Sequence, residues 1–306
     1  MNARDPALLE IGMPATVRSE SADLRRQSTR HWSRYARLAL RHPGLLLAGL
    51  FLFVLLLAAI HPPLLVSGDP LATSARDAFL PPGVGHWLGT DENGRDVLTR
   101  LVYGTRKSLI MAFAASMCAL VGGIVLGLAA GLGPRWLDAA VMRAVDVLLG
   151  FPDLLLALVI ITFWGQSAVN AVIAIGISGI PRYARLIRAQ AQIVRSSGYV
   201  EAASTLGVSR PRIIVRHVLP NAMKSTLLLA TISVGGKIGA VAALSFLGFG
   251  APPPAPEWGA MLSVGRDYLA NAWWLMAAPA LTVIATVLAI SGLGRAVMRR
   301  REGKTA

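Results

Sequence analysis

Long stretches without a single charged residue are the feature that most constrains the fold of this chain. Three of them, 44–60, 108–132 and 273–294, contain no charge at all. Uncharged apolar runs of about 18 residues or more are typical of helices that span a membrane. Charged residues make up only 15% of the 306 positions, whereas a soluble domain carries about 25%. We therefore predict an all-α integral membrane protein.

Three further apolar stretches raise the expected number of transmembrane helices to six. They cover about 141–164, 167–186 and 225–247. In the stretch 167–186 few residues precede Pro181, so we expect this helix to continue past the proline until the arginines that follow it reach the lipid headgroups. A segment that enters and leaves the membrane on one side is the alternative for this stretch.

The basic residues orient the six helices. If the N-terminus lies in the cytoplasm, 23 of the 30 Lys and Arg residues fall on the cytoplasmic side or at its membrane boundary, and six fall on the opposite side. This asymmetry is the positive-inside pattern. It predicts a multi-pass protein of the cytoplasmic (inner) membrane with both termini inside.

The predicted helices divide the chain into a basic cytoplasmic tail, the first helix, an extracytoplasmic segment, a membrane core of five helices and a cytoplasmic C-terminal tail. Their bounds are 1–43, 44–60, 61–107, 108–294 and 295–306. The core includes a long cytoplasmic loop at 187–224. The net charge of +14 could indicate nucleic-acid binding, but the arginine-rich stretch 25–41 lies where anionic lipid headgroups attract basic residues. We therefore predict membrane lipid, and no nucleic acid, as its partner.

The sequence lacks motifs for catalysis or metal binding. Cys118 is the only cysteine, which excludes an intrachain disulfide and a cysteine metal site. In the cluster 91–96 the glycine comes too early for an EF-hand, so calcium binding is the alternative to a turn that leads into an amphipathic surface helix over about 96–103. The glycines before Lys237 lack the spacing of a phosphate loop. We predict no catalytic residue, metal or cofactor in this chain.

The longest cytoplasmic loop holds the most informative pattern. Good helix formers over 199–206 are followed by Gly207, a common helix stop. Ser209 can cap a second helix with Pro211 in its first turn, and Pro220 would end that helix. We therefore predict two short helices joined by a tight turn.

The first of these two helices is suited to contact another protein. Ala202 and Ala203 would let a partner's groove approach the backbone, and Glu201 supplies one negative charge among seven arginines between 182 and 216. Glu201 and His217 have no nucleophile near them in the sequence and no third residue that would complete a catalytic triad. We interpret both as residues of a docking surface.

The loop resembles the EAA loop of ABC importer permeases. The residues at the spacing of that motif are Glu201, Ala202, Ala203, Gly207, Leu219 and Pro220. His217 occupies a position that is usually Ile. The resemblance implies that this loop forms a coupling helix that docks on an ATP-binding subunit.

Other segments narrow the resemblance to one type of subunit, the second (C-type) permease subunit of dipeptide, oligopeptide and nickel importers, which has MetI-like architecture. The similar segments are 88–104, 244–250, 258–262 and 273–274. The likeness extends over about 40–295. Members commonly carry an acidic residue where this chain has Val241.

This resemblance implies a function and a set of partners. The chain would be a non-catalytic subunit that translocates peptides, driven by ATP hydrolysis on other subunits. Its partners would be a second permease subunit, two ATP-binding subunits that hold ATP and Mg, and an extracytoplasmic substrate-binding protein. Nickel or another small solute is the alternative substrate. An ion-coupled secondary transporter is the alternative class, although such proteins need more charged residues at mid-membrane.

Charged residues inside the predicted helices are candidates for the transport pathway. A lysine at mid-membrane costs about 2.5–3.5 kcal/mol on insertion scales, so we expect Lys237 to face the helix bundle or a wet pathway. Contact with substrate, a structural partner and snorkelling are its alternative roles. Asp153 is the second candidate, in the third predicted helix. Asp146 is expected to pair with Arg143, one helical turn before it.

Overall fold

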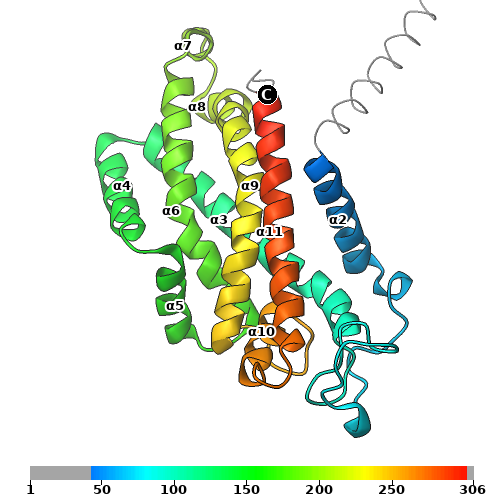
Figure 1. Cartoon of the computed structure of the whole chain (residues 1–306). Coiled ribbons are helices and arrows are strands. Elements are labelled where there is room, and N and C mark those ends of the chain that lie inside the picture. Colours follow the sequence, from blue (N-terminus) through cyan, green and yellow to red (C-terminus); the bar gives the residue numbers. More distant parts are fainter. Residues whose placement is uncertain (1–42, 302–306) are drawn as a thin grey trace, which may run out of the picture. The chain divides into compact units, whose positions relative to one another are not determined.

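The computed structural model of the chain describes residues 43–301, and all side chains in that range except those at 224, 225, 228 and 299–301. These residues form helices joined by turns and loops, with no β-strand among them (Figure 1). The predicted N-terminal tail, apart from Pro43, lies outside the described residues. So do the last five residues of the predicted C-terminal tail.

The helices differ in length from one short turn to 36 residues. The α-helices of the described range are α2 (Pro43–Ile60), α3 (Val97–Leu132), α4 (Arg135–Leu149), α5 (Asp153–Trp164), α6 (Ala168–Arg195), α7 (Gly198–Thr205), α8 (Arg210–Ile213), α9 (Leu219–Leu244), α10 (Trp258–Asp267) and α11 (Trp274–Arg301). Short 3₁₀ turns occupy Pro62–Leu64 and Ala75–Asp77, and π-helical turns occupy Ile214–Val218 and Ser245–Phe249. The predicted C-terminal tail thus begins as a continuation of α11.

Four helices of the described range are long and apolar enough to cross a membrane unaided. They are Pro43–Ile60, Val97–Leu132, Leu229–Phe249 and Trp274–Met298. α4 and α5 together would form a fifth, bent span. α6 has the length, with 28 residues, but arginines occupy its second half. The all-α membrane fold is confirmed, and a sixth span formed by α6 stays a prediction.

Prolines have different effects in the predicted helices at 141–164 and 167–186. α4 and α5 meet at 98°, so the stretch 141–164 is sharply bent, and a span at this place stays a prediction. Pro152 lies at the break, and a proline disfavours helical geometry at the residue before it, here Phe151. α6 continues past Pro181, as predicted. Membrane helices tolerate an internal proline where neighbouring helices surround it.

The surface helix expected over 96–103 is instead the start of a longer helix. α3 runs without interruption from Val97 to Leu132. Asp96 is its N-cap, and a carboxylate oxygen accepts a hydrogen bond from the Thr99 backbone N–H at 2.7 Å. The expectation of a separate amphipathic helix was wrong because Gly104, the residue after Tyr103, does not end the helix but is buried within it against Pro256 and Trp258.

α3 and α6 pack closely along a face of small residues. Gly123, Gly127 and Gly131 are buried at four-residue spacing on α3. A Cβ atom added to Gly127 would lie 2.7 Å from the Ala184 carbonyl oxygen and 2.8 Å from the Ile187 Cβ atom. Small residues let helices associate in lipid, where burial of apolar surface contributes little. The two backbones therefore depend on these glycines for their close approach.

The main apolar core lies where α3, α5, α6, α9 and α11 meet. One buried member from each helix is Ala115, Ile161, Ile175, Leu244 and Val283. Large apolar side chains on the outside of the same helices are exposed, such as Phe163 on α5 and Leu281 and Leu288 on α11. An apolar exterior of this kind fits contact with lipid.

Candidate functional site

The short helix α7 presents the Glu201 segment at the end of α6 (Figure 1). The Gly207 N–H donates to the Ser204 carbonyl oxygen at 3.0 Å and closes the helix. Gly207 has a φ of +77°, in the left-handed region that other residues rarely adopt. The predicted helix and its glycine stop are confirmed.

The second predicted helix of the loop begins as expected but does not end as expected. Ser209 occupies the N-cap position, although its side chain makes no capping hydrogen bond, and Pro211 lies in the first turn. The chain then passes through the π-helical turn Ile214–Val218 directly into α9. Pro220 therefore lies in the first turn of α9, and its predicted role as a helix end was wrong. Pro220 has no backbone N–H to donate. The wider π turn before it makes this missing donor tolerable.

A small apolar core of its own holds this loop against the ends of α3 and α6. Its buried members are Ala191, Val194, Val200, Ile213 and Val218. Leu128 and Leu132 at the end of α3 pack against them. Because packed interiors transmit strain, a displacement of α7 would act on both long helices.

One face of α7 is open to a partner. Glu201 and Ala202 are exposed, and Leu206 exposes 83% of its surface. Ala203 is half-buried against the apolar core of the loop. Ala202 is therefore the more open alanine of the pair, because successive helical residues are turned by about 100°. The expectation that both alanines let a partner approach α7 stays a prediction.

His217 connects α7 to the beginning of α9. Its ring centroid lies 6.1 Å from that of Tyr199 on α7. The Asn221 side-chain amide donates to the Tyr199 hydroxyl at 3.2 Å and to the His217 carbonyl oxygen at 2.7 Å. Near the same residues, Leu219 is half-buried and Pro220 is exposed. His217 thus helps to position α7 as well as lining the loop surface.

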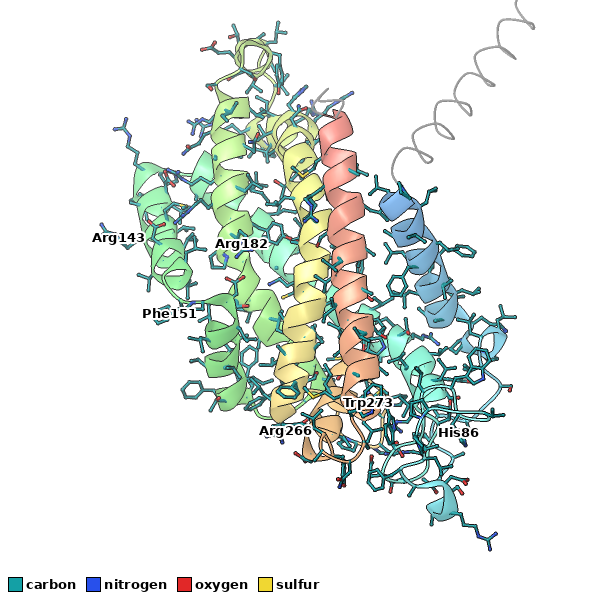
Figure 2. All side chains as sticks on the ribbon, viewed as in Figure 1. His86, Arg143, Phe151, Arg182, Arg266 and Trp273 are labelled. Atoms are coloured by element: carbon teal, nitrogen blue, oxygen red, sulfur yellow. The ribbon has the colours of Figure 1, made fainter. Side chains whose placement is uncertain are left out.

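Three ion pairs join the arginines of α6 to carboxylates of α4 and α5. The pairs, with their N–O distances, are Arg188–Asp138 at 2.5 Å, Arg185–Asp146 at 2.5 Å and Arg182–Asp153 at 3.1 Å. The predicted pair of Asp146 with Arg143 was wrong. Figure 2 shows Arg143 on the side of α4 that faces away from α6. The packing of α4 beside α6 brings Arg185 to Asp146 instead.

Lys237 is buried near the middle of α9 and reaches α6. Its Nζ atom donates to the Ile175 carbonyl oxygen at 3.0 Å, and 8% of the residue is exposed. A side chain at Gly179 would overlap this Nζ atom, so the glycine makes room for the ammonium group. Within residues 43–301, no carboxylate with a described side chain lies at ion-pair distance from Lys237. Lys237 therefore faces the helix bundle and not lipid.

A cavity of about 340 Å³ lies between α5, α6 and α9. Its polar lining residues are Asp153, Ser178, Arg182, Ser233 and Lys237. The two charged candidates for the pathway, Lys237 and Asp153, thus line the same space. Bending between α4 and α5 places the beginning of α5 there.

The acidic cluster 91–96 forms an ion-pair network. Asp91 Oδ2 lies 2.6 Å from Arg95 Nε and 3.3 Å from Arg100 Nε, and both arginines are buried. Arg100 also donates to the Pro254 carbonyl oxygen at 3.4 Å. In the described part of the chain no group of three or more His, Cys, Asp or Glu residues is arranged to hold a metal ion. The cluster therefore links the segment before α3 to the loop before α10.

Two structural features are not among those predicted from the sequence. Glu257 is fully buried as the N-cap of α10, where its carboxylate accepts from the Gly259 and Ala260 N–H groups at 2.9 and 2.8 Å. Little in the sequence signals this cap, because Glu is not among the usual N-cap residues. The glycine face of α3 was visible as three glycines four residues apart, a spacing that favours close helix packing.

Residues 123–303 match the family described as binding-protein-dependent transport system inner membrane component. This match covers more than half of the chain. The chain belongs to this family of ABC importer permeases. The resemblance of its cytoplasmic loop to the EAA loop of such permeases is consistent with this membership.

Several relatives of the permease have names that concern peptides. It is 40% identical over 259 residues to a putative peptide transport system permease protein of Brucella abortus biovar 1, covering 85% of this chain and 87% of that protein. It is 41% identical over 239 residues to the dipeptide transport system permease protein DppC of Alkalihalophilus pseudofirmus, covering 78% and 79%. It is 36% identical over 264 residues to the glutathione transport system permease protein GsiD of Pectobacterium atrosepticum, covering 86% and 88%.

Solved structures support the fold of the permease. The inward-facing MetNI methionine ABC transporter aligns with a TM-score of 0.54 and 20% identity, over 66% of this chain and 95% of that chain. An amino acid ABC transporter solved with histidines aligns with a TM-score of 0.52 and 21% identity, over 66% and 94%. The predicted MetI-like architecture is confirmed.

Proposed function

We propose that this permease is one of two transmembrane subunits of an ABC importer that moves peptides across the cytoplasmic membrane, and that it carries no catalytic activity itself. The names of its peptide, dipeptide and glutathione permease relatives support a peptide substrate. A second permease subunit completes the pathway. Two ATP-binding subunits hydrolyse ATP with Mg, and an extracytoplasmic binding protein delivers the substrate.

The observation that carries this proposal is that one face of α7 is exposed while the other packs against the loop core. The helix exposes Glu201 and Leu206 to a partner, while Val200 anchors its other face in the loop core beside α3 and α6. A partner that grips α7 and changes its own conformation would therefore move two long helices together. Rigid-body movement of packed elements is a common way to exchange two states of a protein.

A groove in the same loop extends the surface available to an ATP-binding subunit. Its lining residues are Pro211, Arg212, Val215, Arg216 and Pro220, and its volume is about 630 Å³. The two arginines suit acidic side chains, and the exposed Val215 suits an apolar one. Pro220 of the motif lines this groove, which supports its assignment to the docking surface.

The proposed orientation has the loop 187–224 and both termini in the cytoplasm. The arginines of this loop support it, because basic residues collect on the cytoplasmic side of inner-membrane proteins. The segment 61–107 and the loop before α10 then face the binding protein. ATP-binding subunits have access to α7 only in this orientation.

Reversal of the charge on α7 tests the coupling role. We expect Glu201→Lys to lower peptide uptake and binding-protein-stimulated ATPase activity of the reconstituted importer at least tenfold, because a basic partner group that faces Glu201 would be repelled. Glu201→Gln is the matched control, since it keeps the size of the side chain, and it should retain most activity. Both variants should insert into the membrane in normal amounts. Normal uptake by Glu201→Lys complexes would show that the coupling surface lies elsewhere.

The energy source separates this proposal from an ion-coupled secondary transporter. Uptake by the complete importer in proteoliposomes should require ATP inside and survive collapse of the ion gradients. Uptake that continues without ATP and stops when the gradients are collapsed would favour the secondary transporter. Measuring uptake under both conditions with one preparation distinguishes the two classes of transporter.

A further inference from the structure

We propose that the cavity between α5, α6 and α9 is a transit site, in which Lys237 binds a carboxylate of the peptide as it crosses the membrane. This inference rests on the proposed function as a peptide importer. It assigns a binding role to a buried lysine for which the coupling mechanism has no use. The argument follows from the position, charge and surroundings of that residue.

The position of Lys237 requires a polar environment. It lies near the middle of the apolar span Leu229–Phe249, where a charged side chain costs about 2.5–3.5 kcal/mol on insertion scales. Its ammonium group has three N–H donors, and one hydrogen bond, to the Ile175 carbonyl oxygen, is formed within the described residues. The remaining donors are available to the cavity that Lys237 lines.

The charge of the cavity favours an anion. Arg182 and Asp153 form an ion pair at 3.1 Å and largely neutralise each other. The positive charge of Lys237 is then left without a neutralising partner among the lining residues. A carboxylate would complete the charge balance, whereas Ni²⁺ would be repelled by two positive groups facing one negative group. The cavity therefore favours a peptide over the alternative metal substrate.

The other walls of the cavity suit the rest of a small peptide. Its volume of about 340 Å³ falls within the usual range of ligand pockets, about 300–1,000 Å³. Ser178 and Ser233 contribute hydroxyl oxygens that can accept from peptide N–H groups, and Leu154, Ala157 and Ala240 contribute apolar surface. Transport proteins commonly place a substrate site near mid-membrane, where it can be reached in turn from either side.

A lysine also suits a site that must release its substrate. An ammonium group binds a carboxylate as a point charge, without the two-point geometry of an arginine. Gly179 leaves the room that the ammonium group itself occupies. The site can therefore hold a carboxylate during passage without retaining it, which fits a step of transport better than a high-affinity receptor.

Uptake by substituted importers tests the role of Lys237. With alanylalanine as the probe, we expect Lys237→Met to lower the maximal uptake rate at least tenfold, with little change in the concentration of loaded binding protein that gives half-maximal rate. Lys237→Arg should retain a substantial part of the uptake because it keeps the charge. Unchanged uptake by Lys237→Met, or equal losses in both variants, would overturn the proposal.

Thiol labelling tests occupancy of the cavity directly. In a Cys118→Ala importer, the cavity-lining Ala240→Cys variant should react with a charged methanethiosulfonate reagent, and alanylalanine should slow the reaction several-fold. Its amide, alanylalaninamide, should protect less, and protection should vanish when Lys237→Met is added. Equal protection by the two probes, or none by either, would contradict a carboxylate site.

The two proposals fail in different ways. If the wild-type importer takes up no alanylalanine with ATP present, the peptide function fails, and the transit site fails with it. If the wild-type importer takes it up and the Lys237→Met variant does so at the same rate, only the transit site is wrong. The wild-type measurement therefore belongs in every series.

Discussion

Arg188 and Asp138 form a two-point ion pair between α6 and α4, with Nε–Oδ1 at 2.5 Å and Nη2–Oδ2 at 2.6 Å. Their side chains are 30% and 23% exposed. The neighbouring pair on the same two helices, Arg185–Asp146, has a single contact, and its side chains are 55% and 57% exposed. The two pairs form a matched comparison of how burial and geometry determine the strength of an ion pair.

We expect Asp138→Asn to lower the free energy of unfolding by about 1–2 kcal/mol, because charge-assisted hydrogen bonds with partial shielding from water are lost. Asp146→Asn should cost less than about 0.5 kcal/mol, since exposed pairs contribute little. Thermal unfolding of the detergent-purified importer, followed by fluorescence, measures both. Equal losses would mean that the two-point geometry has no energetic consequence.

The contact between α3 and α6 predicts a strong effect of adding a single methyl group. Gly127→Ala would place a Cβ atom 2.7 Å from a backbone oxygen of α6, so the helices must separate. We expect a loss of about 1–3 kcal/mol, typical of overpacking. Gly292→Ala on α11 is the control, because nothing lies within 4 Å of the added atom. Similar melting temperatures of the two variants would contradict the close packing.

The left-handed conformation of Gly207 predicts a loss of coupling without a clash. Nothing lies within 4 Å of an added Cβ atom there, so any effect of Gly207→Ala comes from the φ of +77°, which costs about 1–2 kcal/mol in other residues. We expect uptake and stimulated ATPase activity to fall several-fold, and Gly207→Asn to be milder. Gly198→Ala, equally unobstructed at the start of α7, should behave as wild type. Loss in both alanine variants would point to a different cause.

The proposed orientation predicts which residues a reagent can reach from outside the cell. Val84 is fully exposed in the segment before α3, and Ser204 is exposed on α7. In a Cys118→Ala background, an impermeant maleimide should label the Val84→Cys variant in intact spheroplasts. It should label the Ser204→Cys variant only after the membrane is opened. Labelling of Ser204→Cys in intact spheroplasts would show that the orientation is the reverse of the proposed one. In that case α7 could not contact an ATP-binding subunit in the cytoplasm.

Features that depend on neighbouring residues in the chain were predicted well. The charge-free stretches 44–60 and 273–294 correspond to α2 and to most of α11. The stop at Gly207 and the position of Pro211 at the beginning of α8 were also predicted. All of these features depend on hydropathy or on backbone preferences within a few residues. They can be predicted without knowing which residues pack nearby.

Features that depend on residues far apart in the sequence were not predicted correctly. Asp146 pairs with Arg185 on another helix because α4 packs beside α6, an approach that follows the sharp turn between α4 and α5. Pro220 was expected to end a helix, but the π turn before it lets the chain continue into α9. The partial burial of Ala203 against the apolar core of the loop likewise depends on distant residues.

The amino-acid order thus specified a helical membrane protein and a short helix with a glycine stop, because apolar runs and backbone preferences act over a few residues. Packing of the helices specified the partners of the charged side chains and the cavity at Lys237. In lipid, apolar burial discriminates little between one helix contact and another. The close approach at Gly127 and the ion pairs of α6 therefore select the arrangement, and their energies exist only when distant segments meet.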